Sequence, residues 1–379
     1  MENKGFFKTR VSADSTSKNK RATAEYTILS KKQYKIKSVQ FPVDSSDLGK
    51  SKFNDTYYHL KHQIFYGLSF GLIGFFIFSN FYYKNLKKLA VFLLITNIIL
   101  LILVFTPLGV SYRGASRWLN IGPFSVQPAE FLKLSFIVYM AAWLSGKKFD
   151  RQTSFFKGLL PFMAVSGLIA FLIFLQPATT IILIILAAAL IVYFMSGAKI
   201  SHIAGIILLG IIFFAVLIYS SNDYRLKRII TFLNGGDKQS SAYQINQSKT
   251  AIGSGGLFGT GFGKSTTKYK YLPEPIGDSI FAVIAEELGL VGALALILTF
   301  FILIWRSFAI AKKSSDQFAK LTVIGFTSII AIQTFIHIAA ISGILPLTGV
   351  PLPFISYGGT SLAVFLTMAG IIGNISKHT

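Results

Sequence analysis

Leu-Pro-Glu-Pro-Ile-Gly-Asp-Ser-Ile-Phe-Ala-Val (residues 272–283) joins a long polar segment to an apolar run that continues to about residue 305. A bilayer core about 30 Å thick needs roughly 20 apolar residues in a helix that crosses it. The run therefore predicts a membrane span, with Asp278 where lipid head groups meet hydrocarbon. A carboxylate at that boundary can face water and still contact a lipid-linked substrate.

The composition of the whole chain agrees with a membrane protein. It has 379 residues, of which 53% are hydrophobic and 14% charged, whereas a soluble domain has about 25% charged residues. The net charge of +22 falls in a tail and in loops, which favours contact with membrane lipids and pyrophosphates over nucleic acid. Cysteine is absent and the five histidines are scattered, so the sequence predicts no disulfide and no metal site.

Nine apolar runs predict an all-α polytopic membrane protein, because a backbone in lipid must satisfy its hydrogen bonds within helices. The expected spans are residues 64–83, 89–107, 129–145, 158–175, 178–197, 202–219, 279–305, 320–343 and 354–374. Residues 1–60 are polar and basic and are expected to be disordered, and residues 61–379 are expected to form the transmembrane domain. Gly67 and Gly71 either let two helices pack closely or are tolerated without a role.

Alternation of the spans assigns the loops to two sides. The short links rich in Lys and Arg are cytoplasmic by the positive-inside rule, and the longer segments 108–128 and 220–278 are then extracytoplasmic. This assignment places the amino terminus outside, whereas the basic tail 1–63 favours the inside. The conflict predicts that a first span is missing from this chain.

Ionisable residues within spans are costly and mark either a cavity or an internal ion pair. Glu130 and Lys133 lie on one helix face, where they form a polar cavity wall or lock two helices together. Glu286 follows Asp278 by about 80° around a helix. It therefore either faces the same cavity as a substrate-binding residue, or it or Glu287 pairs with a cation.

Other interruptions of the apolar pattern lie near the predicted outer face. Arg117, with Trp118 after it, either contacts substrate or marks the membrane boundary. The glycine-rich stretch 253–265 is no P-loop, because Phe258 stands where that motif needs glycine, but its glycines either cradle a phosphate or permit turns. Breaks at Gln176-Pro177 and across 346–361, together with Asp278 and Glu130, outline a cavity that opens to the outer leaflet.

Four segments, in this order, resemble the SEDS family of shape, elongation, division and sporulation proteins, which includes FtsW, RodA and SpoVE. They are Arg-Trp-Leu-Asn-Ile-Gly-Pro-Phe-Ser-Val-Gln-Pro-Ala-Glu-Phe-Leu-Lys (117–133), Tyr-Gln-Ile-Asn-Gln-Ser-Lys-Thr-Ala-Ile-Gly-Ser-Gly-Gly-Leu-Phe-Gly (243–259), Leu-Pro-Glu through Glu-Glu-Leu-Gly (272–289) and Gly-Val-Pro-Leu-Pro-Phe-Ile-Ser-Tyr-Gly-Gly-Thr-Ser (349–361). The resemblance runs from about residue 60 to the end.

The resemblance implies a ten-span bundle in the bacterial cytoplasmic membrane that polymerises lipid II into peptidoglycan glycan chains at the outer face. A class B penicillin-binding protein and other division or elongation proteins are the implied partners, and within the family the resemblance favours an FtsW-like protein. The family's catalytic carboxylate falls on Asp278. Its cavity pair falls on Glu130 and Lys133, and its Arg-Trp pair on Arg117 and Trp118.

Three departures from the family pattern accompany the resemblance. The first of the family's ten spans has no counterpart, and the polar tail stands in its place. Ala178 stands where the family usually has Asp after Gln-Pro, and Ile276-Gly277 stands where it often has His-Thr before the acid.

Polymerisation by this family predicts a single inverting displacement with Asp278 as general base. Cations that could stabilise the leaving pyrophosphate are a divalent ion such as Mg²⁺ or the side chains of Arg117, Lys133, Arg225, Lys227, Arg228 and Lys249.

The alternative function is that of a lipid II flippase, because broken helices and buried charges also occur in transporters. A third interpretation is a passive scaffold. Asp278 at the outer boundary favours the enzyme, since a flippase needs access from both leaflets.

Overall fold

The computed structural model describes residues 11–18, 21–28, 34–35, 39–40, 59–112, 115–121, 124–146, 152–176, 178–220 and 240–379. The chain divides into two compact units, Met1–Lys61 and His62–Thr379. In the first, β1 (Val11–Lys18) and β2 (Arg21–Ile28) pair antiparallel, and β3 (Tyr34–Lys35) and β4 (Val39–Gln40) each pair with β2. These strands are the described structure of the tail; its expected disorder stays a prediction.

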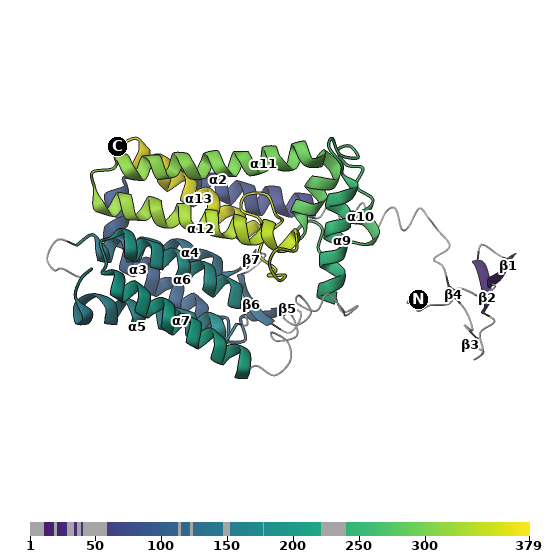
Figure 1. Ribbon diagram of the computed structural model, residues 1–379, viewed down its shortest axis with the longest axis horizontal. Helices are drawn as coiled ribbons and strands as arrows, with labels where there is room; N and C mark the ends of the chain where they lie inside the picture. Colours follow the sequence, from purple (N-terminus) through teal and green to yellow (C-terminus); the bar gives the residue numbers. More distant parts are fainter. Residues whose placement is uncertain are drawn as a thin grey trace. The chain divides into compact units, whose positions relative to one another are not determined.

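The second unit is nearly all-helical (Figure 1). Its long helices are η1 (Gln63–Leu68) continuing into α2 (Ser69–Asn80), α3 (Tyr83–Leu103), α4 (Pro128–Leu144), η2 (Phe155–Leu159) continuing into α5 (Leu160–Phe174), α6 (Thr179–Met195), α7 (Ile200–Ser220), α11 (Ile280–Lys313), α12 (Gln317–Ile341) and α13 (Gly359–Ser376). Two further helices, α9 (Ser240–Ser254) and α10 (Thr267–Lys270), precede α11. A small antiparallel sheet that the sequence did not predict, β5 (Gly109–Tyr112), β6 (Ala115–Ile121) and β7 (Phe124–Val126), lies between α3 and α4.

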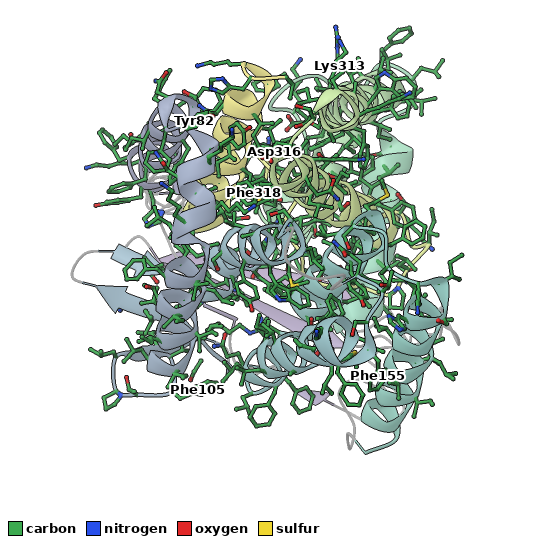
Figure 2. All side chains as sticks on the ribbon, turned by 90° about the vertical axis from the view of Figure 1, so that its left-hand side faces the viewer. Tyr82, Phe105, Phe155, Lys313, Asp316 and Phe318 are labelled. Carbon is green, nitrogen blue, oxygen red and sulfur yellow. The ribbon has the colours of Figure 1, made fainter. Side chains whose placement is uncertain are left out.

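Each of the nine predicted spans coincides with a helix in the described part of the chain, which confirms the polytopic helical class. Among the described residues, six helices are long and apolar enough to cross a membrane by length and composition: His59–Asn80, Tyr83–Leu103, Phe155–Phe174, Ile280–Lys313, Gln317–Ile341 and Gly359–Ser376. α6 and Ile200–Ile212 of α7 are apolar but shorter, and α4 carries two charges. Figure 2 views the bundle from one end, with exposed Phe105 and Phe155 at its periphery and Phe318 buried inside.

Gly67 and Gly71 let α13 approach η1 and α2 closely. A Cβ on Gly67 would lie 3.0 Å from the Cα of Gly359, and a Cβ on Gly71 would lie 3.2 Å from the Cα of Ala363. In lipid, where tails are as apolar as side chains, helix pairs depend on such close van der Waals packing. The packing interpretation of these two glycines is therefore confirmed.

α12 is the central helix and α11 a peripheral one. In the most apolar 18-residue window of each helix, 78% of α12 is buried inside the protein but only 17% of α11. Asp316 caps the start of α12, because its carboxylate accepts a hydrogen bond from the backbone N of Ala319 at 3.2 Å. At its other end, the loop 342–358 leads back to α13, so the more buried of these two helices carries the loop that lines the site described next.

β6 and α9, from the two segments predicted to be extracytoplasmic, lie toward the same end of the second unit (Figure 1). β6 contacts the α5–α6 junction through Arg117, and Thr180 Oγ1 donates to the carbonyl of Thr348 at 3.2 Å. α9 lies across this same end in Figure 1. At the opposite end, Asn374 Nδ2 donates to the carbonyl of Ser79 at 2.9 Å, so the last residues of α2 and α13 lie together there.

Candidate active site

Asp278 ends a compact turn that precedes α11. Ser279 fixes this turn, because its Oγ donates to the carbonyl of Pro273 at 2.9 Å and its backbone N donates to the carbonyl of Glu274 at 3.1 Å. Gln244 of α9 donates to Ser279 Oγ at 2.9 Å. Glu274 has a positive φ of 47°, a strained conformation that surrounding contacts must maintain. Asp278 is therefore presented by an ordered, half-buried turn.

The loop 342–358 is fastened directly to this turn. Ser356 Oγ donates to the carbonyl of Gly277 at 2.8 Å, and the backbone N of Tyr357 donates to the carbonyl of Ile276 at 2.8 Å. Gly349 has a φ of 64°, and a Cβ there would lie 3.3 Å from Asp278 Oδ2. The carboxylate of Asp278 thus lies against the backbone of Gly349.

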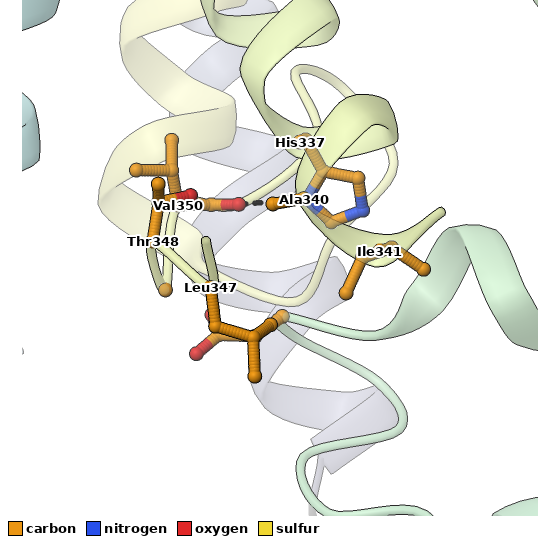
Figure 3. Close-up of a pocket in the computed structure, with 8 residues that line it drawn as sticks. His337, Ala340, Ile341, Leu347, Thr348 and Val350 are labelled. Atoms are coloured by element: carbon orange, nitrogen blue, oxygen red, sulfur yellow. Dashed lines mark hydrogen bonds between the residues drawn. The ribbon is translucent and has the colours of Figure 1, made fainter. Parts of the chain in front are cut away.

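Asp278 and the loop enclose a small pocket with the end of α12 (Figure 3). Its lining residues are Asp278, His337, Ala340, Ile341, Leu347, Thr348, Gly349 and Val350. Its empty volume of about 150 Å³ includes open solvent, and the space between the lining side chains is too small for a water molecule. For a reacting group to reach Asp278, the substrate must therefore lie at the open side of the pocket or the lining side chains must move apart.

A buried polar network supports the pocket from beneath. Lys133 Nζ lies 2.7 Å from Glu130 Oε2 and donates to Gln333 Oε1 at 2.9 Å, and Lys133 and Glu130 are 1% and 3% exposed. Gln333 Nε2 donates in turn to the carbonyl of Pro351 at 2.9 Å. The predicted pair is thus an ion pair within α4, and Lys133 links it through Gln333 of α12 to the loop that lines the pocket.

His337 holds the same loop one turn further along α12. Its Nδ1 lies 2.7 Å from the carbonyl oxygen of Val350, so Nδ1 carries the proton of this hydrogen bond. Thr180 of α6 binds the carbonyl before Gly349, and Gln333 and His337 of α12 bind two carbonyls after it. Sequence reasoning missed His337 and Gln333. Their i, i+4 spacing could have identified them, because it places two polar residues on one face of an otherwise apolar helix.

Arg117 and Trp118 lie on β6, away from the lining of this pocket. Arg117 Nε donates to the carbonyl of Gln176 at 3.0 Å, and Gln176 Nε2 donates to the carbonyl of Leu101 at 3.3 Å. Arg117 therefore ties the small sheet to the break between α5 and α6. Trp118 pairs with Val110 across the sheet. Arg113 and Pro177 lie outside the described residues.

Glu286 is placed against a loop instead of in the pocket lining. It is 1% exposed and accepts hydrogen bonds from Ser265 Oγ at 2.6 Å, from the backbone N of Thr266 at 3.1 Å and from the hydroxyl of Thr267. The helical projection from Asp278 did not apply, because α11 begins only at Ile280. Glu287 forms the cation pair that was the alternative, with Lys268 at 2.5 Å.

Residues 255–264, which we call the glycine finger, supply hydrogen-bond partners to the backbone of α11 where that helix is broken. Gly289 has φ 68° and ψ −169°, which interrupts the helix. The backbone N atoms of Thr260 and Gly261 donate to the carbonyls of Glu286 and Glu287 at 2.9 and 3.0 Å. Those of Leu290 and Val291 donate to the carbonyls of Gly256 and Leu257 at 2.9 and 3.1 Å.

Glycine is required in the finger for this close approach. A Cβ on Gly255 or Gly259 would collide with the carbonyl oxygens of Ala285 or Glu287. A broken helix near the membrane is stable only where other groups satisfy its freed backbone. The finger therefore serves the fold of α11, and its bound backbone N atoms are not available to cradle a phosphate.

A divalent ion was one candidate for stabilising the leaving group. Within the described ranges, no three His, Asp or Glu side chains come close enough to hold a metal ion. Mg²⁺ can be held by one or two carboxylates with substrate phosphates, and Asp278 is the one carboxylate among the pocket-lining residues. Among the described residues, Asp278 would be the single carboxylate ligand in the pocket lining, and one such ligand does not define a metal site.

Comparison with known proteins gives consistent matches over most of the chain. The family of cell cycle proteins that comprises FtsW, RodA and SpoVE matches residues 41–379. Stage V sporulation protein E of Bacillus subtilis is 37% identical over 330 residues, covering 86% of this chain and 89% of that protein. A probable peptidoglycan glycosyltransferase FtsW of Trichlorobacter lovleyi is 39% identical over 334 residues, covering 88% and 87%.

Solved structures share the fold. The rod shape determining protein RodA of Thermus thermophilus is 27% identical with a TM-score of 0.59, over 82% of this chain and 85% of that one. A chain from a study of how a peptidoglycan synthase complex coordinates polymerization and crosslinking has a TM-score of 0.71 at 24% identity, over 85% and 90%. The chain is therefore a multi-pass membrane protein that belongs to the FtsW, RodA and SpoVE family of cell cycle proteins, as its four segments predicted.

Proposed function

We propose that this protein is an inverting peptidoglycan glycosyltransferase that polymerises lipid II at the outer face of the bacterial cytoplasmic membrane, with Asp278 as general base. The observation that carries the proposal is the position of Asp278. Of the described residues that line the pocket, it alone bears a carboxylate, and it lies at the end of the bundle predicted to be extracytoplasmic. The relatives named as probable peptidoglycan glycosyltransferases support the reaction class.

The reaction forms one glycosidic bond and breaks one bond to phosphate. The 4-hydroxyl of the acceptor sugar gives its proton to the Asp278 carboxylate as its oxygen attacks the anomeric carbon of the donor. The bond from that carbon to the polyprenyl pyrophosphate breaks, and the pyrophosphate leaves with the electron pair. Because the donor is α-linked and the glycan β-linked, one displacement with one base suffices, and a positioned base contributes about 10²–10⁴-fold.

The developing charge on the pyrophosphate needs a cation at the mouth of the pocket. Lys133 cannot reach it directly, since its ammonium is buried and bound to Glu130 and Gln333. Lys249 is better placed. It is exposed on α9, and its Nζ lies 2.6 Å from the position of a Cβ on Gly343, at the start of the loop that lines the pocket. Arg225, Lys227 and Arg228 lie outside the described residues.

The fixed loop explains how Glu130 and Lys133 contribute without touching substrate. Lys133 orients Gln333, which holds the carbonyl of Pro351 two residues from Gly349. Misplacing a reacting group by about 1 Å can lower the rate about 10²-fold. We assign both residues to positioning the loop against Asp278.

We further propose that the protein works beside a class B penicillin-binding protein, which crosslinks the chains that it makes, and among other division or elongation proteins. A polymerase at the outer leaflet releases an uncrosslinked chain, so a transpeptidase on the same side must receive it. The fold relative from a complex that coordinates polymerization with crosslinking motivates this proposal.

Reconstitution distinguishes the enzyme from the flippase. The purified protein is placed in vesicles, lipid II is supplied only in the leaflet that Asp278 faces, and products are separated by gel electrophoresis. We expect glycan polymer from the wild type and none from Asp278→Asn, with both proteins eluting alike on size exclusion. Movement of labelled lipid II between leaflets without polymer would instead establish the flippase, and full polymerisation by Asp278→Asn would exclude this base.

A further inference from the structure

The glycine finger exposes large apolar side chains that the fold does not cover. Leu257 is 62% exposed, Phe258 81% and Phe262 87%, whereas the backbone at 256–257 and 260–261 is hydrogen-bonded to α11. Contiguous exposed apolar side chains mark either a membrane or a protein interaction surface. The position of the finger along α11 decides between these two occupants.

The length of the apolar part of α11 indicates how deep the glycine finger lies in the membrane. After the break at Gly289, outward-facing apolar residues run from Leu290 to Trp305, and Arg306 follows. This stretch of 16 residues is about 24 Å long at 1.5 Å per residue, close to the hydrocarbon core of about 30 Å. The break and the finger bound to it therefore lie at the outer edge of the hydrocarbon.

The apolar surface of the finger is continuous with the lipid-facing surface of α11. The backbone N of Val291 donates to the carbonyl of Leu257 at 3.1 Å, and Leu290 and Val291 are themselves 50% and 54% exposed. Lys264, also exposed, follows the finger's apolar residues, and its stem lies over Gly261. Apolar side chains beside a lysine with an extended stem are typical of the boundary between acyl chains and anionic head groups.

We propose that the glycine finger is a membrane-inserting element, with Leu257, Phe258 and Phe262 among the outer acyl chains and Lys264 among anionic head groups. Its backbone bonds to residues 286–291 fix the first turns of α11, which follow Asp278, at a set depth in the outer leaflet. The finger needs no partner protein for this insertion, and the inference is independent of the reaction proposed above.

The absence of cysteine from the chain makes the test direct. Phe258→Cys and Phe262→Cys are each labelled with an environment-sensitive fluorophore in the full-length protein. The variants are reconstituted in vesicles of phosphatidylethanolamine and phosphatidylglycerol. Leu298→Cys, in the lipid-facing middle of α11, is the lipid control, and Lys264→Cys is the head-group control. Quenching is measured with nitroxide-labelled acyl chains and with aqueous iodide.

Both finger positions should be quenched by acyl-chain nitroxide, as Leu298→Cys is, and several-fold less by iodide than Lys264→Cys. Iodide access equal to that of Lys264→Cys at either position, in vesicles that contain this protein alone, would overturn the proposal. It would be overturned equally if only added partner protein shielded the two positions, since the surface would then be a protein interface.

Discussion

Asp278, in the turn before α11, and Glu286, within α11, are acids eight residues apart in the sequence, and their surroundings differ. Glu286 is 1% exposed and surrounded by donors from residues 265–267. Asp278 is half-buried and lines a pocket. A general base needs a lone pair that substrate can reach. The comparison teaches that the loop packed against an acid, and not its position along the helix, decides between a structural and a chemical role.

The two loops that pack near these acids, the glycine finger and the loop 342–358, also differ in role. The glycine finger satisfies the backbone of a broken helix, so its glycines are needed for contact with protein. The loop 342–358 is held from behind by α6 and α12, and it turns Gly349 toward Asp278. Changes near the finger should therefore affect folding, and changes near Gly349 should affect turnover.

The largest loss of stability is expected from Lys133→Met, in the network under the pocket. Removing the ammonium leaves the Glu130 carboxylate buried without its cation, which costs about 3–5 kcal/mol. Thermal unfolding of the purified protein in detergent measures the loss. The double variant Glu130→Gln, Lys133→Met should recover most of it without recovering polymerisation. A double variant as unstable as the single one would contradict the pairing.

Glu286→Ala should lower the free energy of unfolding by about 3 kcal/mol, because it leaves several buried donors of residues 265–267 without an acceptor. Asp278→Asn is the matched control, with a melting temperature close to that of the wild type. Equal stability of Glu286→Ala and the wild type would break the contrast between the two acids.

Gly349→Ala should lower polymerisation about tenfold, because a methyl group there displaces the Asp278 carboxylate from its reacting position. Gly197→Ala is the control: Gly197 also has a positive φ, of 98°, but a Cβ there meets nothing within 4 Å. Both variants carry backbone strain of about 1–3 kcal/mol. Turnover per folded molecule should fall only for Gly349→Ala, and a parallel fall in both would point to strain alone.

Lys249→Gln should have the smallest effect, about threefold to tenfold in rate, because an exposed cation in high dielectric contributes about 1 kcal/mol. Initial rates at several lipid II concentrations measure it. Lys313→Gln, an exposed lysine at the opposite end of the bundle, serves as the control. An unchanged rate for Lys249→Gln would contradict the proposal that Lys249 stabilises the leaving pyrophosphate.

Much of the fold was readable from the sequence, because length and hydropathy determine a span within a bilayer. The nine helix positions, the packing of Gly67 and Gly71, and the adjacency of Glu130 and Lys133 all follow from local spacing. The sheet β5–β7 and the partners of Glu286 were not predicted. They depend on loops whose backbone folds by contact with distant segments, and such contacts leave no periodic pattern.

The candidate site was predicted only in part, because some of its residues show in local sequence patterns and others act through contacts with distant segments. Asp278 stands at a visible change from polar to apolar sequence. His337 and Gln333 act on the carbonyls of Val350 and Pro351 across a proline-rich break, which hydropathy does not describe. Periodicity also failed for Glu286, since residues 272–279 form a turn and not the first turns of α11.

The most direct test compares the two acids in one assay. Asp278→Asn and Glu286→Gln are reconstituted in the same vesicles, and polymer formed from lipid II is measured per folded molecule. Our account predicts that Asp278→Asn falls by about 10²–10⁴-fold, whereas folded Glu286→Gln retains most of the wild-type rate. Wild-type polymerisation by Asp278→Asn, or an equal loss in both variants, would contradict the assignment of Asp278 as the base.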